Sequence, residues 1–449
     1  MNTFGQKSAK YIPLNNSATP FEIYKSISEN YDHSFLFESL AGPNEMVETT
    51  IMGFDPDSII YVYSDSIVTI NRDGKEERKV VEDPFSYIRE ILGRTDDDRY
   101  RYAGGAVGVV NYDAIGLWEK VAHCDLDDKP IMEFGVYTDG IVYDHAKRKP
   151  FYFYHKVDRY EELETGGKIG KFFATKPKSL TDLKMFSKMV ERAKKYVIAG
   201  DIFQVVLSRR YTFETKGDPL QVYQKLRTLN PSPYLYHIKT AKRTIIGASP
   251  EMLLRVDNDT VETFPIAGTC KVTNSVIENK RLKEEMVHSE KEIAEHTMLV
   301  DLGRNDVGRV CIPGSINVKE LMKVKQFSHV QHMVSHVSGK LAENKDMFNA
   351  FSGIFPAGTV SGAPKVRAME IIDELESVAR GPYAGTVGYF SFNGCCDFAI
   401  TIRSIFFEGQ KGFIQAGAGI VYDSDAKSEF EETEHKVGAM LDALTEASE

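Results

Sequence analysis

The chain has 449 residues, of which 42% are hydrophobic, and carries a formal net charge of -10 with a pI of about 5.7. This length is sufficient for two to three domains. Lysine and arginine form no long block, which disfavours a nucleic-acid-binding role. No apolar run approaches the roughly 20 residues that a membrane-spanning helix needs.

The first residues, Met1–Gly5, lack the apolar region of a signal peptide. Five cysteines form no CxxC pair; they are Cys124, Cys270, Cys311, Cys395 and Cys396. An odd number of thiols in a long chain is typical of reduced cysteines. We therefore expect a cytoplasmic protein.

Residues 1–165 are predicted to be rich in strands, because β-branched and aromatic residues dominate runs such as 60–63 and 66–70. Residues 161–179 are polar and interrupted by glycine and proline, and we place a boundary there. The second region, 180–449, begins with a predicted helix, in which apolar residues recur at helical spacing over 186–197.

Strands and helices then alternate in larger blocks. Strands are predicted at 203–213, 234–238, 243–247, 252–256, 260–264, 383–393, 398–407 and 412–420. Helices are predicted at about 275–304, 318–325, 364–378 and 428–445.

The two regions repeat short phrases in the same order. Residues 50–57 (TIMGFDPD) resemble 244–251 (TIIGASPE), and 102–108 (YAGGAVG) resemble 383–388 (YAGTVG). Two matches in one order favour a duplicated strand framework. Since the long predicted helices occur only after residue 180, we expect the chemistry in the second region and leave the first free for regulation.

The most informative phrase is Phe264-Pro265-Ile266-Ala267-Gly268-Thr269. Its Gly-Thr pair predicts a tight loop with free backbone N–H groups, which suits a carboxylate ligand. An ordinary turn explains the phrase equally simply.

Two acidic segments follow. Glu292 and Glu295 lie three residues apart on one helix, and Glu429 and Glu432 repeat that spacing near the C-terminus. Carboxylate pairs from two helices suit Mg²⁺, which prefers oxygen ligands. The alternative is helix capping, since Ser428 and Glu431 fit a capping box.

Residues 355–365 (FPAGTVSGAPK) form a glycine-rich loop that opens a helix at Pro364, where backbone N–H groups can hold an anion. A plain helix start is the alternative. Residues 415–420 (QAGAGI) can bring backbone against a ligand, or mark a close strand crossing. Arg403, on a predicted strand, is a candidate carboxylate ligand, and His332 is a candidate proton carrier.

Taken together, these segments resemble the chorismate-utilising enzymes, most closely the large (component I) subunits of anthranilate synthases. The resemblance covers nearly the whole chain and is densest from about 200 to 440. It implies an α+β fold, layered α/β/β/α, with a large antiparallel β-sandwich flanked by helices. It also implies chorismate as substrate and Mg²⁺ as cofactor.

The residue types at two positions distinguish the enzymes of this family by the product they form. Gln204 stands where isochorismate and salicylate synthases have a lysine that activates water, and Ala267 stands where aminodeoxychorismate synthases commonly have a nucleophilic lysine. Both replacements favour direct attack by ammonia and anthranilate as product. Aminodeoxychorismate synthase, an isochorismate- or salicylate-forming enzyme and a silent amino-acid-binding regulator remain the alternatives.

The resemblance also implies roles for single residues. Glu251 would be the general acid that releases the C4 hydroxyl, and His332 would help remove the C2 proton. Metal ligands would be Glu295, Glu432, Glu292 and Glu429. The enolpyruvyl carboxylate would be bound by Tyr383, Arg403, Gly417 and Lys436, and the ring pocket would be lined by Gly268, Thr269 and Thr359.

A feedback site for tryptophan is implied in the first region. It would consist of Glu38, Ser39, Pro233, Tyr234 and Leu235. Glu38 would hold the ligand's ammonium, unless residues 35–39 are only a core strand with Glu38 turned to solvent. No glutaminase segment is present, so we expect a separate glutamine amidotransferase subunit and a hetero-oligomer.

Overall fold

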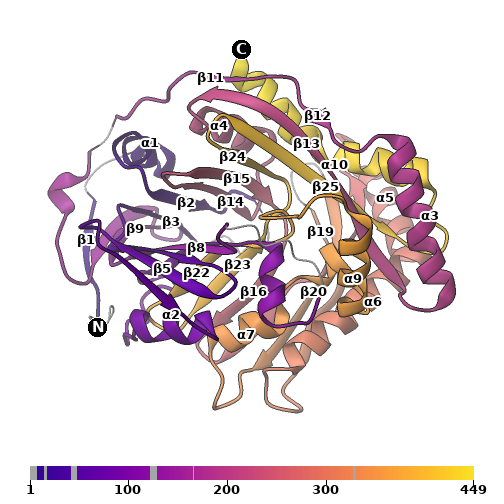
Figure 1. The fold of residues 1–449 in the computed structure, drawn as a ribbon, viewed down its shortest axis with the longest axis horizontal. Helices are drawn as coiled ribbons and strands as arrows, with labels where there is room; N and C mark the ends of the chain where they lie inside the picture. Colours follow the sequence, from indigo (N-terminus) through magenta and orange to yellow (C-terminus); the bar gives the residue numbers. More distant parts are fainter. Residues whose placement is uncertain (1–7, 15–17, 42–47, 122–128, 165, 327–329) are drawn as a thin grey trace.

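The computed structural model describes residues 8–14, 18–41, 48–121, 129–164, 166–326 and 330–449, apart from the side chain of Thr269. These residues form two large, mostly antiparallel sheets that pack face to face, with helices on the outside (Figure 1). The layered α/β/β/α prediction is confirmed. Cys124 lies outside the described residues.

The first sheet has 13 strands. In spatial order they are β1 (Lys10–Pro13), β10 (Lys149–Tyr154), β9 (Asp139–Asp144), β3 (Thr49–Phe54), β2 (Ser34–Glu38), β14 (Tyr234–Lys239), β15 (Arg243–Ser249), β24 (Ser404–Glu408), β25 (Lys411–Ile420), β13 (Gln204–Gly217) and β11 (Phe172–Ala174), while β12 (Lys178–Ser179) and β21 (Gly362–Ala363) pair with β13.

The second sheet has 12 strands. They are β18 (Ile266–Lys271), β20 (Val330–Lys340), β17 (Thr260–Thr263), β16 (Met252–Asp257), β23 (Cys396–Ile400), β22 (Thr386–Ser391), β7 (Gly105–Val110), β8 (Met132–Tyr137), β4 (Ser58–Val62), β5 (Ser66–Asn71) and β6 (Glu76–Val80), while β19 (Asn317–Gln326) pairs with β20.

Helices cover the outer faces. The 13-stranded sheet is covered by α1 (Pro20–Asn30), α4 (Leu220–Leu229) and α10 (Ala426–Ser448). The 12-stranded sheet carries α2 (Pro84–Leu92), α5 (Val276–His288), α6 (Glu290–Gly308) and α7 (Met347–Ile354). The remaining helices, α3 (Leu183–Ala199), α8 (Gly358–Ser361) and α9 (Lys365–Leu375), lie beside β13.

Local sequence explains where several helices begin and end. Thr19 and Glu22 form a capping box before α1, and Pro20 occupies its first turn. Asp182 caps α3, which ends at Gly200 in a left-handed conformation with φ of 83°. Along β2, Phe35 faces the other sheet and Leu36 faces the helices, as strand alternation requires.

The predicted duplication is visible in the order of the strands. In the 13-stranded sheet β3 and β2 lie next to β14 and β15, and in the 12-stranded sheet β8 and β7 lie next to β22 and β23. Strand β7 pairs with β22 so that Gly108 is directly opposite Gly388, its counterpart in the repeated phrase. Both sheets therefore contain strands from both regions, on either side of a pseudo-two-fold axis.

Three predicted elements are wrong. Residues 318–325 form part of strand β19 instead of a helix, because Val318, Met322 and Val324 alternate with exposed residues and the segment pairs with β20. The single helix at 275–304 is two helices, since Ser289 ends α5 and caps α6. The strand at 398–407 is divided between the two sheets, with β23 in one and β24 in the other.

Candidate active site and a second pocket

Glu251 lies where the chain crosses from one sheet to the other, between β15 and β16. The Ile400 N–H donates to its carbonyl oxygen at 3.0 Å. Its side chain is only 7% exposed. Burial raises the pKa of this carboxyl from 4.5 to about 7, while Thr359 and Lys436 oppose the rise. Glu251 can therefore hold a proton near neutral pH and donate it.

A small cavity lies beside Glu251. Leu299 and Leu302 of α6 line it, together with Ile354 at the end of α7 and Thr359 of α8. The loop at 355–365 is therefore more than a helix start, because its residues 358–361 form α8 and place Thr359 on the same cavity as Glu251. The Oγ1 atom of Thr359 is buried there and makes no hydrogen bond among the described atoms.

The four predicted carboxylate-binding residues lie together although they come from four segments. A Cβ atom on Gly417 would stand 2.9 Å from the Tyr383 hydroxyl. Lys436 donates from Nζ to the Gly417 carbonyl oxygen at 2.9 Å, and Arg403 donates from Nη1 to the Lys436 carbonyl oxygen at 2.6 Å. The Tyr383 hydroxyl and the Lys436 ammonium thus lie next to β25 at Gly417, where the strand has no side chain, and Arg403 is bonded to the backbone of Lys436.

Arg403 is not on a strand, contrary to the prediction. It lies in the crossover between β23 and β24 with a left-handed φ of 53°, a conformation that is uncommon for a residue other than glycine. Burial lowers the pKa of its guanidinium, and Tyr383 and Glu432 oppose this. Glu251 and Arg403 therefore both occupy points where the chain changes sheets.

His332 lies on β20 opposite Thr269 of β18. Its Nδ1 atom is 3.1 Å from the carbonyl oxygen of Gly268, which has a φ of 65°. Burial lowers the pKa of His332, and the charge of Arg403 adds to this. The imidazole is therefore neutral at neutral pH and able to accept a proton. The side chain of Thr269 lies outside the described residues, so its predicted contact with substrate stays a prediction.

The carboxylates of the two acidic segments are close enough to raise one another's pKa values. Burial raises the pKa of Glu295, and the negative charges of Glu292 and Glu432 raise it further. Burial and the charge of Glu432 likewise raise the pKa of Glu429. A Cβ on Gly268 would stand 3.0 Å from Glu292 Oε2, which places the metal candidates beside the predicted ring pocket.

These acids do not cap α10. Asp425 is the capping residue, because its side chain accepts from the Ser428 N–H at 2.9 Å, so the predicted capping box at Ser428 is wrong. Lys436 contacts Glu432 at 2.5 Å. Among the described residues, no three histidine, cysteine, aspartate or glutamate side chains converge closely enough to hold an ion.

The two family-sorting positions are both buried. Gln204 opens β13, and its amide lies over Gly419 on β25 so closely that a side chain there would clash. Its Oε1 atom has no hydrogen-bond partner among the described atoms. Ala267 lies on β18 opposite Met333.

The residues of the first region that correspond to Glu251 and Arg403 make different contacts. The repeated phrase aligns Asp57 with Glu251, and the matching strand registers align Asp139 with Arg403. Thr138 hydrogen-bonds to Asp57, and Arg159 donates to both oxygens of Asp139. In the first region both positions thus carry an aspartate whose carboxylate already has a partner, so the pairing of an acid with a cation found at Glu251 and Arg403 is not repeated.

A second, open pocket lies between the sheets. Four of the five predicted inhibitor-binding residues line it: Glu38, Ser39, Tyr234 and Leu235. The fifth, Pro233, borders it, because its carbonyl oxygen accepts from Ser39 Oγ at 2.6 Å. The structure therefore brings these segments from the two regions together around one pocket.

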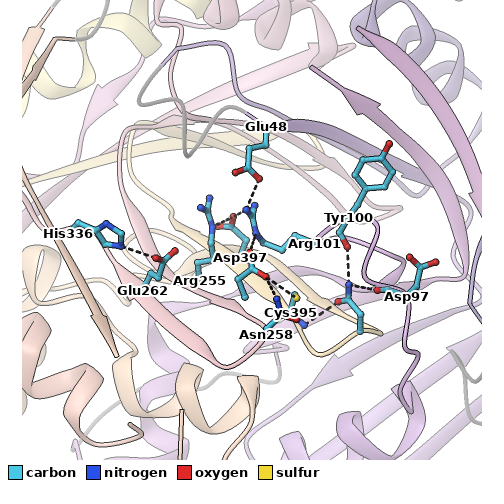
Figure 2. A network of polar contacts seen from close by, with 12 residues as sticks. Glu48, Asp97, Tyr100, Arg101, Arg255, Asn258, Glu262, His336, Cys395 and Asp397 are labelled. Carbon is cyan, nitrogen blue, oxygen red and sulfur yellow. Dashed lines mark hydrogen bonds and ion pairs between the residues drawn. The ribbon is translucent and has the colours of Figure 1, made fainter. Parts of the chain in front are cut away.

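Charged residues that the sequence analysis missed also line this second pocket. Figure 2 shows the polar contacts among them. Arg101 points to Glu48 at 2.6 Å, and Arg255 donates from Nε to Asp397 at 2.9 Å. Tyr234 donates its hydroxyl to the same Asp397 at 3.0 Å. The one available signal was Arg255, a charged residue inside the otherwise apolar run 252–256.

Glu38 does not face solvent, so that alternative is wrong. Its side chain is almost fully buried, and Arg227 donates to both carboxylate oxygens at 3.0 and 3.1 Å. Tyr223 donates a third hydrogen bond at 2.7 Å. A ligand ammonium at Glu38 would therefore share a carboxylate that Arg227 already neutralises.

The family described as "chorismate binding enzyme" matches residues 11–442. The "Anthranilate synthase component 1" of Methanothermobacter thermautotrophicus is 42% identical over 455 residues, covering 99% of this chain and 96% of that protein. The protein of the same name from Saccharolobus solfataricus is 40% identical, covering 96% and 98%.

Solved structures agree. Anthranilate synthase component I from Streptococcus pneumoniae superposes with a TM-score of 0.79 at 34% identity, covering 96% of this chain and 99% of that chain. The menaquinone-specific isochorismate synthase MenF from Escherichia coli has a TM-score of 0.73 at 17% identity, covering 99% and 96%, which shows a shared fold. No helix in the described ranges has the length and apolar character of a membrane span. The chain therefore belongs to the chorismate binding enzyme family, among the anthranilate synthase component 1 chains.

Proposed function

We propose that this chain converts chorismate and ammonia to anthranilate and pyruvate, as the large subunit of an anthranilate synthase. The relatives' names and nearly complete coverage support the proposal. The observation that carries it is Glu251, a buried carboxyl with a pKa of about 7 that stands near the cation Lys436. A bound, anionic substrate would meet a proton donor and fixed positive charge in one site.

The chain's own residues would act on opposite sides of the substrate ring. Ammonia attacks C2, and Glu251 donates a proton to the C4 hydroxyl, which leaves as water. His332, held neutral by burial, then accepts the C2 proton while the C3–O bond breaks, so that the enolpyruvyl group leaves, takes up a proton and becomes pyruvate as the ring becomes aromatic. Fixed donors at Tyr383, Arg403 and Lys436 would hold the enolpyruvyl carboxylate in place, and such preorganised charge supplies most of the catalytic effect in many enzymes.

The carboxylates of α6 and α10 supply the oxygen ligands that Mg²⁺ prefers. Glu295 and Glu432 would hold it, with Glu292 and Glu429 beside them, because like charges that raise one another's pKa values are relieved by a cation. Mg²⁺ usually takes only one or two protein carboxylates and keeps waters or substrate oxygens, so a closed cluster is not required. When bound, it would supply positive charge to the substrate's ring carboxylate.

Anthranilate is favoured over sibling products by two side chains. Gln204 offers an amide instead of the lysine that activates water, and Ala267 offers no nucleophile. The unpaired Oε1 of Gln204 can accept a hydrogen bond from ammonia as it approaches. Ammonia would come from a glutamine amidotransferase partner, so the isolated chain should use ammonium salts and not glutamine.

The second pocket would bind tryptophan as a feedback inhibitor. Its apolar and aromatic lining suits an indole ring, and its charged residues offer partners for an amino acid's carboxylate and ammonium. The cytoplasmic location stays a prediction.

The test is to incubate the purified chain with chorismate, Mg²⁺ and ammonium chloride and to identify the product by chromatography and fluorescence. Anthranilate with equimolar pyruvate is expected. Aminodeoxychorismate, isochorismate or salicylate would replace the proposal with a sibling activity, and unchanged chorismate would leave the amino-acid-binding regulator.

A further inference from the structure

Among the residues that the structure describes, Arg380 is one of the two largest side chains with almost no exposed surface, and it makes hydrogen bonds beyond its ion pair. It follows α9 and is 1% exposed. Its Nε and Nη2 atoms donate to the two carboxylate oxygens of Glu376 at 2.9 and 2.7 Å. This fork alone would satisfy a structural role.

The remaining donors of Arg380 reach two segments that carry candidate site residues. Nη1 donates to the carbonyl oxygen of Val360 at 2.7 Å, directly after Thr359. Nη2 donates to the carbonyl oxygen of Val206 at 2.7 Å, two residues after Gln204. The guanidinium also lies 5.7 Å from the centre of the Tyr383 ring.

The partner of Arg380 extends the same network. Glu376 Oε1 accepts from both the N–H and the hydroxyl of Ser208, at 2.7 and 2.8 Å. Ser208 lies opposite Gly417 in the β13–β25 register. The pair Arg380–Glu376 therefore contacts α8, β13 and the ring of Tyr383.

A second buried cation holds the other end of the glycine-rich loop. Lys365 Nζ contacts Asp306 at 2.6 Å and donates to the Ile354 carbonyl oxygen at 2.8 Å. Both side chains of this pair are almost fully buried. Thr359 thus lies on a segment that is fixed at 354 and 365 by Lys365 and at 360 by Arg380.

We propose that Arg380 is a positioning residue for the reaction, which acts by holding Thr359 against Glu251, with Lys365 bracing the same loop. Arg380 touches neither substrate nor reacting atoms. A planar guanidinium that is bonded to two carbonyls and one carboxylate restricts the backbone in three directions, which a lysine with one flexible ammonium cannot do. A displacement of about 1 Å at a catalytic side chain can cost about 100-fold in rate.

The inference rests on the proposed function, and a double-mutant cycle tests it. The variants are Arg380→Lys, Thr359→Val and both together, assayed for kcat, KM and the pH dependence of kcat/KM. Arg380→Lys is expected to lower kcat about 10- to 100-fold with little change in KM. In the Thr359→Val background the same substitution should lower kcat less than about threefold, because its target hydroxyl is gone.

The pH profile gives a readout that general destabilisation does not move. Thr359 opposes the rise in the pKa of Glu251. If Arg380→Lys releases Thr359, that opposition weakens, the pKa of Glu251 rises and the alkaline limb of kcat/KM moves to higher pH. Thr359→Val should move the limb in the same direction, and the double variant no further.

Arg159→Lys is the matched control. Arg159 is also buried and fork-bonded to a carboxylate, Asp139, and donates to the Phe54 carbonyl oxygen at 3.2 Å, but it lies in the first region. It should leave the pH profile unchanged, and its effect should add to that of Thr359→Val. If Arg380→Lys does not fold, Lys365→Met takes its place in the cycle.

Full additivity of Arg380→Lys with Thr359→Val, or an unmoved alkaline limb, would overturn the proposal. The cycle is measured on whichever chorismate-derived product the parent chain forms. A product other than anthranilate would therefore reject the proposed function while the coupling between Arg380 and Thr359 was still measured. A parent chain that consumes no chorismate would reject both.

Discussion

Glu251→Gln should stabilise the protein while it removes activity. In the folded chain burial raises the pKa of Glu251 from 4.5 to about 7. Between these two values the folded state holds a proton that the unfolded state has lost, so rising pH costs stability until both states are ionised. Glutamine has nearly the same shape and never ionises, so it avoids this cost.

The magnitude follows from the pKa difference. At about 1.4 kcal/mol for each pKa unit, the full penalty is about 3 kcal/mol above pH 8 and about 1.4 kcal/mol at pH 5.5. Glu251→Gln should therefore gain about 2 kcal/mol more in free energy of unfolding at pH 8 than at pH 5.5. Loss of a general acid should lower kcat by roughly 100- to 10,000-fold.

Urea unfolding of the two proteins at pH 5.5 and pH 8 measures this difference, with anthranilate formation assayed in parallel. A stability gain that does not depend on pH would show that Glu251 has an ordinary pKa. Full activity in the variant would show that Glu251 is not the acid. Either result would refute the reasoning.

Three other perturbations test neighbouring features. Gly417→Ala should raise KM for chorismate at least about tenfold, because its Cβ would stand 2.9 Å from the Tyr383 hydroxyl, whereas Gly438→Ala, where the space is open, should not; equal KM values would contradict this. Glu295→Gln should raise the Mg²⁺ concentration that gives half-maximal rate, measured by metal titration, and an unchanged requirement would reject the metal assignment. Ser39→Ala, which removes the hydrogen bond to the Pro233 carbonyl, should weaken tryptophan inhibition without lowering kcat, and an unaltered inhibition curve would count against the second pocket.

Local pattern predicted most strands of the second region correctly, because β-branched and aromatic runs bounded by turns need little tertiary information. Residues 318–325 show where this fails. Apolar and charged residues there fit a helix and a strand almost equally, and pairing with β20 decides the outcome. The short helices α1, α2 and α4 were not predicted from residue patterns.

The residues of the candidate site could be predicted from the sequence, but their arrangement in space could not. Glu251 and Arg403 are separated by more than 150 positions, and they meet because the chain changes sheets at both points. The family resemblance supplied the residues, while the crossovers explain the convergence. Arg380 escaped notice because nothing local distinguishes an exposed arginine from a buried one that bonds two distant backbone carbonyls.

The most direct test is a crystal structure of the Glu251→Gln chain with chorismate and Mg²⁺. We predict the ring between residue 251 and His332, the enolpyruvyl carboxylate at Arg403 and Lys436, and the metal between α6 and α10. Chorismate bound elsewhere, or a metal held by other residues, would contradict the account.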